Sequence, residues 1–151
     1  MGAPTCVVGA TGICSYAEFN ASGVLMAVVL IVEDEVFIRQ NAEWMIQDLG
    51  HSTLLAGNLF EAFAHLATPQ SIDAIFVDIR LGSVANGGYN IADQAMDSRP
   101  GLRVLYTSGS PLTADMSNRF VGGGQFLQKP YSSDQLGTSL EALLSEIATQ
   151  F

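Results

Sequence analysis

The segment Ala27-Val-Val-Leu-Ile-Val-Glu-Asp-Glu35 decides the fold, because six apolar residues run without interruption into three acids. A continuous apolar run of this length is typical of a strand that is buried on both faces, as in a parallel sheet. Apolar residues then recur at helical spacing from Val36 to Leu49, and Gly50 ends the stripe. The segment therefore predicts a strand and a following helix, with acids at the carboxyl end of the strand.

The same alternation continues along the rest of the chain. Further strands are predicted at 52–56, 72–77, 102–106 and 125–128, and further helices at 58–67, 90–97, 112–121 and 134–148. Alternating strands and helices favour an α/β fold with a parallel sheet, and right-handed crossovers reduce the options to a doubly wound sheet. We therefore predict one domain over residues 26–151, a five-stranded parallel sheet flanked by helices.

The net charge and the apolar content of the chain limit the classes of partner that it is expected to bind. The 151 residues include 15 acids and 6 basic residues, a formal charge of −9, and Lys129 is the single lysine. An acidic chain repels nucleic acid and anionic membrane surfaces, so we expect neither as a direct partner. No stretch reaches the ~18 uninterrupted apolar residues of a transmembrane helix, so we expect no membrane insertion.

Residues 1–25 are interpreted as a flexible leader without chemistry. They contain no Lys or Arg, so the positive region of a signal peptide is missing. Cys6 and Cys14 match neither a disulfide framework nor a zinc motif, so we expect a reducing, cytoplasmic location. Whether this segment is part of the natural protein is left open by the sequence.

Polar side chains follow four of the predicted strands. Glu33 and Asp34 follow the first, Asp78 the third, Thr107 the fourth and Lys129 the fifth. Ligands of doubly wound sheets bind beyond the carboxyl ends of the strands, so we expect these side chains to share one site. Converging carboxylates favour a cation such as Mg²⁺, and an aspartate beside Mg²⁺ can attack phosphorus. A lysine and a hydroxyl would then supply the positive charge and the donor for phosphoryl oxygens.

Four segments, each at a predicted strand end, resemble the receiver domain of two-component response regulators. They are Val29-Leu-Ile-Val-Glu-Asp-Glu35, Val77-Asp-Ile-Arg-Leu81, Leu105-Tyr-Thr-Ser108 and Phe126-Leu-Gln-Lys-Pro130. The resemblance covers roughly residues 26 to 148 and implies a flavodoxin-like fold. Four such motifs in the same order are far more specific than any one of them.

The resemblance implies a phospho-acceptor and a Mg²⁺ site. Asp78 matches the aspartate that accepts the phosphoryl group, and Asp34 matches the direct carboxylate ligand of Mg²⁺. Glu33 matches the neighbouring acid, which acts through metal-bound water. The main-chain carbonyl of Arg80, two residues past Asp78, would complete the ligands from the protein.

Three further positions are implied to sense the phosphoryl group. Thr107 and Lys129 match the hydroxyl and the ammonium that contact its oxygens. Phe126 matches the aromatic switch residue that turns inward when the threonine moves, although a core role explains it equally well.

The family function implied is acceptance of a phosphoryl group on Asp78 from a histidine kinase, with Mg²⁺ present. Catalysis is then limited to transfer to, and hydrolysis from, the chain's own aspartate. Because the last predicted helix ends the chain, we expect a stand-alone domain whose output is contact with another protein, and a homodimer is one option. The alternatives are a phosphate shuttle or sink, and a pseudo-receiver that only binds protein. A Mg²⁺-dependent phosphohydrolase is disfavoured, because Arg80 stands where such enzymes need a second acid.

Some positions carry a structural expectation only. Gly87 and Gly88 are interpreted as flexible loop positions, in a loop that is longer than the family's usual turn and therefore expected to be mobile. His51 is interpreted as a half-exposed surface histidine, and Trp44 as a core or partner-facing residue.

Overall fold

The computed structural model describes residues 5–8, 14–17 and 26–148, with side chains from 26 to 145. Two short strands, β1 (Thr5–Val8) and β2 (Cys14–Ala17), pair antiparallel in a sheet of their own. The rest of the predicted leader lies outside the described residues. The flexibility of the leader and the boundary near residue 26 therefore stay predictions.

The central sheet has five strands, all parallel. They are β3 (Val28–Val32), β4 (Ser52–Ala56), β5 (Ala74–Asp78), β6 (Arg103–Ser108) and β7 (Gln125–Gln128). Their spatial order is β4-β3-β5-β6-β7, so the chain moves outward from β3 to β4 and then returns across β3 to β5. The predicted doubly wound, five-stranded sheet is confirmed, and its switch point lies between β3 and β5.

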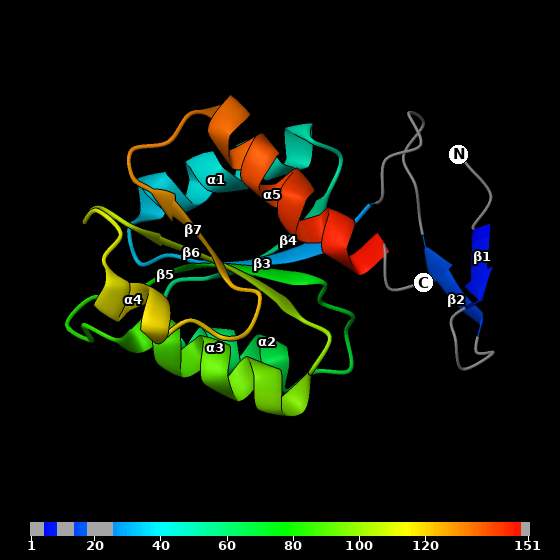
Figure 1. Cartoon of the computed structure of the whole chain (residues 1–151), viewed down its shortest axis with the longest axis horizontal. Helices are drawn as coiled ribbons and strands as arrows, with labels where there is room; N and C mark the ends of the chain where they lie inside the picture. The colour runs from blue at the N-terminus through cyan, green and yellow to red at the C-terminus, as the bar shows by residue number, and fades with distance from the viewer. Residues whose placement is uncertain (1–4, 9–13, 18–25, 149–151) are drawn as a thin grey trace.

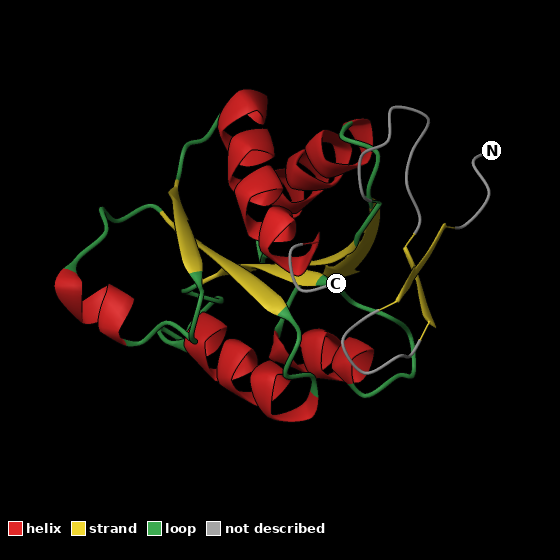
Figure 2. Ribbon diagram, turned by 45° about the vertical axis from the view of Figure 1, so that its right-hand side comes forward, coloured by secondary structure: helices red, strands yellow, loops and turns green. Residues whose placement is uncertain are grey.

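Helices cover both faces of this sheet (Figures 1 and 2). On one face lie α1 (Val36–Asp48) and α5 (Ser133–Ala148). On the other lie α2 (Leu59–Leu66), α3 (Gly87–Ser98) and the short α4 (Ala114–Asn118). Among the described residues, no helix combines the length and the apolar character needed to cross a membrane.

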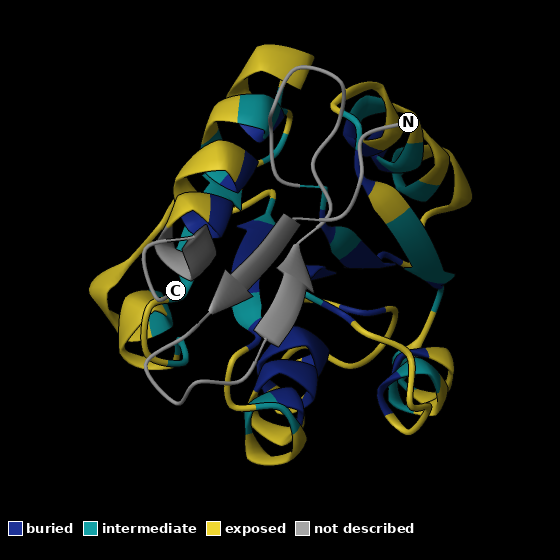
Figure 3. Cartoon of the chain, turned by 90° about the vertical axis from the view of Figure 1, so that its right-hand side faces the viewer, coloured by how far each residue is buried: buried dark blue, intermediate teal, exposed yellow. Residues whose placement is uncertain are grey.

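The core has two halves, one on each side of the sheet. Alternate residues of β3 supply them: Leu30 and Val32 pack toward α2 and α3, whereas Val29 and Ile31 pack toward α1 and α5. This is the two-fold alternation of a strand, with both faces buried because helices lie on both sides. Figure 3 shows the buried sheet between helices whose outer faces are exposed. The apolar run of the sequence is therefore explained by two-sided burial.

The structure corrects the interpretation of Gly87 and Gly88. Both residues are buried in the first turn of α3, which begins three residues earlier than predicted. A Cβ atom on Gly88 would lie 2.4 Å from the carbonyl oxygen of Asp78. The backbone of α3 therefore packs directly against the end of β5, and only glycine fits this approach. These glycines are close-packing positions and not flexible loop positions.

The interpretation of His51 as a surface residue is also wrong. The residue is 9% exposed, and Nδ1 accepts a hydrogen bond of 3.1 Å from the amide of Ala27. Burial lowers the pKa of His51, against the opposing effect of nearby Asp73. Trp44, in contrast, is 57% exposed on α1, so it is not part of the core.

Candidate functional site

Strand register places the predicted site residues in one row across the sheet. Val32 of β3 pairs with Val77 of β5, so Glu33 and Asp78 are the next residues along their strands. Asp78 in turn pairs with Thr107 of β6. β5 and β6 extend past their predicted ends to include Asp78 and Thr107, because this pairing continues the ladder. The carboxyl ends of three adjacent strands therefore bring two acids and a hydroxyl together.

Lys129 reaches this row from the end of β7. Its amide donates a hydrogen bond of 2.8 Å to the carbonyl of Ser108, and the Lys129–Pro130 peptide bond is cis. The ammonium Nζ lies 2.7 Å from both Glu33 Oε1 and Asp78 Oδ2. Burial alone would lower the pKa of Lys129, but the contacts with Asp78 and Glu33 outweigh it and raise that pKa. The lysine is thus held in its charged form.

Glu33 is buried among charges. Its side chain is about 5% exposed, and its pKa is raised from 4.5 to about 8. Burial is the largest cause, and the neighbouring Asp78 adds to it, whereas Lys129 acts in the opposite direction. The second carboxylate oxygen, Oε2, is buried without a hydrogen-bond partner in the described part of the chain. A buried oxygen of this kind is an unused ligand position.

Asp34 lies at the open side of the site and is held by the loop after β5. Its Oδ2 accepts a hydrogen bond of 3.0 Å from the amide of Gly82, a residue with φ of 58°. Leu81 and Val84 close this loop by a pair of main-chain hydrogen bonds of 3.0 and 2.9 Å. The loop after β5 is therefore a bridged turn that contacts Asp34. The mobility expected of this loop stays a prediction.

The acids fit the predicted metal ion. Carboxylate oxygens of Glu33, Asp34 and Asp78 lie within 4.8 Å of one another. Such a set of hard oxygen ligands suits Mg²⁺, which binds one or two carboxylates and keeps several waters. The unpartnered Oε2 of Glu33 agrees with a ligand in this position. Arg80 lies beside these acids, and its amide donates a hydrogen bond of 3.2 Å to Asp78 Oδ1. Ligation by the carbonyl of Arg80 stays a prediction.

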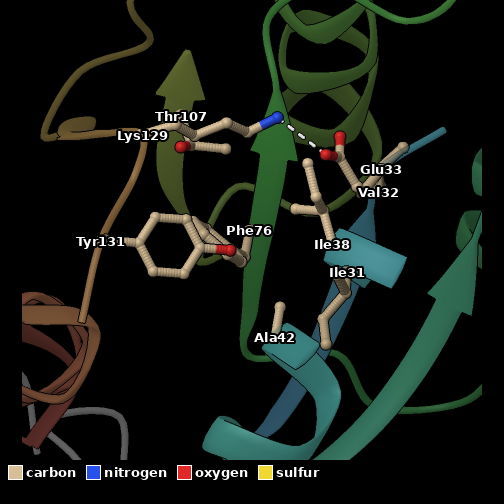
Figure 4. A pocket seen from close by; sticks show the side chains of 9 residues that line it. All are labelled: Ile31, Val32, Glu33, Ile38, Ala42, Phe76, Thr107, Lys129 and Tyr131. Atoms are coloured by element: carbon tan, nitrogen blue, oxygen red, sulfur yellow. Dashed lines mark hydrogen bonds and ion pairs between the residues drawn. The ribbon is translucent and has the colours of Figure 1, made fainter. Parts of the chain in front are cut away.

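Thr107 presents a second unused polar atom. The residue is 3% exposed, and its hydroxyl has no hydrogen-bond partner among the described residues. Figure 4 shows Thr107 and Glu33 on either side of the Lys129 ammonium, above an apolar pocket. Tyr131, which burial gives a raised pKa of about 12, packs edge-on against Phe76 in that pocket. The buried hydroxyl of Thr107 is therefore free to donate to an incoming group.

A pocket of about 310 Å³ opens above the acids. Its lining includes Asp78, Lys129, Arg80, Glu35 and the segment 108–110. Glu35 was not among the predicted strand-end residues, although the run Glu33-Asp34-Glu35 is a signal in the sequence that could have identified it. The pocket is large enough for a phosphoryl group and bound water.

Phe126, the predicted switch residue, is half-buried on β7. Its ring lies 6.3 Å from that of Phe120, which stacks at 4.2 Å on Tyr106. The hydroxyl of Tyr106 accepts a hydrogen bond of 3.0 Å from the amide of Val121. Tyr106 directly precedes Thr107, so the stack links the threonine's strand to the segment before β7. Movement of Phe126 stays a prediction.

Comparison with known proteins agrees with this geometry. The family model described as response regulator receiver domain matches residues 29–141. The chain is 29% identical over 119 residues to Protein PilG of Pseudomonas aeruginosa, covering 76% of this chain and 84% of PilG. It is 26% identical to the probable transcriptional regulatory protein TcrX of Mycobacterium tuberculosis, over 77% of this chain but only 49% of TcrX.

Solved structures show the same fold. A response regulator receiver protein from Sinorhizobium medicae aligns with a TM-score of 0.72 at 25% identity, over 80% of this chain and 95% of that one. A CheY-like receiver domain protein from Methanospirillum hungatei aligns with a TM-score of 0.74 at 20% identity, over 83% and 99%. The family match includes every predicted site residue and all five strands of the central sheet except Val28, the first residue of β3. The chain therefore belongs to the response regulator receiver domain family of two-component systems.

Proposed function

We propose that Asp78 accepts a phosphoryl group from a histidine kinase, with Mg²⁺ present, and that the chain then signals by contact with another protein. The surroundings of Asp78 carry this proposal. An ammonium lies at 2.7 Å from one carboxylate oxygen and a main-chain amide at 3.2 Å from the other. On the next strand, Thr107 offers a buried hydroxyl without a partner among the described residues. A purely structural role for Asp78 would not require an ammonium, an amide and an unpartnered hydroxyl around its carboxylate, so the cluster favours a chemical role.

In the proposed reaction, a carboxylate oxygen of Asp78 attacks the phosphorus of the donor's phosphohistidine. The phosphorus–nitrogen bond breaks, the imidazole leaves with its electron pair, and an acyl phosphate forms. Asp34, Asp78 and the carbonyl of Arg80 would hold Mg²⁺, with Glu33 acting through water, and the bound ion would supply positive charge for the phosphoryl oxygens. Lys129 and the hydroxyl of Thr107 donate hydrogen bonds to the same oxygens.

The proposed output follows from the charge that transfer adds. The ammonium of Lys129 and the hydroxyl of Thr107 turn to the new phosphoryl oxygens, which displaces β6 and the aromatic stack that includes Phe126. The face formed by α4, β7 and α5 then presents a changed surface to a protein target. A role as phosphate shuttle or sink uses the same chemistry without that target. We place these steps in the cytoplasm, and catalysis acts only on the chain's own aspartate.

The test is phosphorylation by acetyl phosphate, followed by intact-mass measurement. Wild type is expected to gain one acid-stable, base-labile phosphoryl group with Mg²⁺, and none with EDTA. Asp78→Asn is expected to gain none. The matched control is Asp97→Asn, which makes the same change at an exposed acid of α3 and is expected to behave as wild type.

Two results would contradict the proposal. Equal labelling of Asp78→Asn and wild type would place the phosphate on another residue. A folded wild type that gains no phosphate at all would favour the pseudo-receiver, a domain that only binds protein.

A further inference from the structure

Arg80 has an unusual position among the cations of this chain. Its amide donates a hydrogen bond to Asp78, which fixes Arg80 beside the acceptor, and the residue is exposed and lines the 310 Å³ pocket. Within the described residues, its guanidinium has neither a hydrogen bond nor an ion pair. An exposed arginine therefore lies at the pocket, with all five of its side-chain N–H donors available.

The other five cations, all within the described residues, are already engaged. Lys129 pairs with two carboxylates, and Arg39 donates to the carbonyl of Glu33 at 2.8 Å. Arg99 donates to three carbonyls around the end of α2, and Arg119 lies 4.3 Å over the ring of Tyr89. Arg103 also has an interaction partner. Within the described residues, Arg80 is thus the one cationic side chain that has no interaction partner and can bind an incoming anion.

The pocket is surrounded by negative charge, so the one cation beside it that is unpaired among the described residues matters for the binding of an anion. Asp34, Glu35 and Asp78 line the pocket, a carboxylate oxygen of Glu33 lies within 4.8 Å of those of Asp34 and Asp78, and the whole chain has a formal charge of −9. Phosphodonors are anions, so the chain as a whole repels them. Lys129 sits deep and is shared by two carboxylates, so it offers little attraction at the entrance.

We propose that the side chain of Arg80 recruits the phosphodonor, by contacting the oxygens of its anionic phosphoryl group at the pocket mouth before transfer to Asp78. A guanidinium matches phosphate oxygens in a bidentate arrangement and stays charged at any physiological pH. Arg80 then contributes to the encounter and orientation of the donor, and the covalent step at Asp78 is unchanged. This inference rests on the proposed function, because it assigns a second role to a residue of the same site.

The experiment measures the rate constant for phosphorylation by acetyl phosphate at low donor concentration, with Mg²⁺ saturating. Arg80→Gln is expected to react about fivefold more slowly than wild type at low ionic strength, because a unit charge close to a dianion is lost. The loss is expected to shrink toward zero in about 0.5 M KCl, where exposed charges are screened. Phosphoramidate, which carries less negative charge, is expected to show a smaller loss. Arg80→Lys, which keeps the charge but loses the bidentate geometry, is expected to fall between wild type and Arg80→Gln.

The matched control is Gln94→Glu, on an exposed position of α3, which changes the net charge by the same amount away from the pocket. Equal rates for Arg80→Gln and Gln94→Glu would overturn the inference, as would a loss that is independent of salt. A rate for Arg80→Lys as low as for Arg80→Gln would also overturn it. In those cases wild type still gains phosphate, so the proposed function stands. A wild type that gains no phosphate overturns both.

Discussion

Replacing Gly88 by alanine sets two physical effects against each other. Gly88 lies in the first turn of α3, where alanine is intrinsically favoured over glycine by about 0.5–1 kcal/mol. The structure opposes this gain. The added Cβ would lie 2.4 Å from the carbonyl oxygen of Asp78 and 2.7 Å from the Cα of Ile79. The sign of the stability change therefore tests the packing of α3 against β5.

The magnitude follows from those distances. Ordinary contact of a Cβ begins near 3.4 Å, so the Asp78 oxygen is a full ångström too close. Both obstructing atoms are main-chain atoms of a buried segment, so no side-chain rotation can relieve the clash. Overpacking of this kind costs about 1–3 kcal/mol, and we expect a value near the upper end. After the propensity gain, Gly88→Ala should lose about 2 kcal/mol of unfolding free energy.

The assay is urea unfolding followed by far-UV circular dichroism. A loss of about 2 kcal/mol lowers the midpoint by about 1 M urea, for a slope of about 2 kcal/mol/M. Gly101→Ala is the control, because its Cβ meets nothing within 4 Å and its φ is not positive. That variant should be neutral or gain about 0.4–1 kcal/mol. A Gly88→Ala variant as stable as wild type would refute the close approach of α3 to Asp78.

Two further predictions concern buried polar groups. Because the pKa of His51 is lowered in the folded state, the contribution of His51 to stability should fall as the pH falls from 6.5 through the folded pKa. In urea midpoints measured from pH 7.5 to 5.0, wild type should lose stability relative to His51→Asn, and a constant difference between the two would assign the effect to another group. Glu33, whose pKa is raised to about 8, acts in the opposite direction in both proteins, so its effect cancels in the difference. Tyr106→Phe removes the acceptor of the Val121 amide and should cost about 1–2 kcal/mol in urea unfolding. Tyr89→Phe removes a hydroxyl that makes no hydrogen bond within the described residues, so it should cost less, and equal losses would contradict the assignment.

Local pattern was sufficient for most of the fold. Strands and helices were predicted within a few residues, because the β3 run is apolar throughout and the α1 stripe has helical spacing. The wrong predictions concern residues whose environment depends on contacts with residues distant in sequence. Gly87 and Gly88 look like loop residues until the end of β5 is packed against them. His51 looks like a surface residue until the amide of Ala27, 24 residues away in sequence, donates to it.

The candidate site also had features that the sequence could predict and features that depended on tertiary contacts. Carboxyl ends of parallel strands meet at one edge, so the order of Glu33, Asp34, Asp78, Thr107 and Lys129 along the chain was enough to predict their convergence. It could not predict the register that sets Asp78 beside Thr107, or the two contacts of 2.7 Å that Lys129 makes. Ladder pairing and side-chain direction depend on the packing of all five strands.

By itself, the sequence determined the doubly wound sheet and the identity of the acids, hydroxyl and lysine at its edge. This was possible because hydrophobic periodicity and strand direction are local properties, and the order of the elements along the chain then predicts their arrangement in the sheet. Only the tertiary structure decided which charges are paired. It buried Glu33 and raised its pKa, joined Lys129 to two carboxylates, and left Arg80 exposed, with a guanidinium that has no hydrogen bond or ion pair among the described residues. Pairing and burial depend on distances between atoms that are remote in sequence, and those distances exist only once the strands and helices are packed.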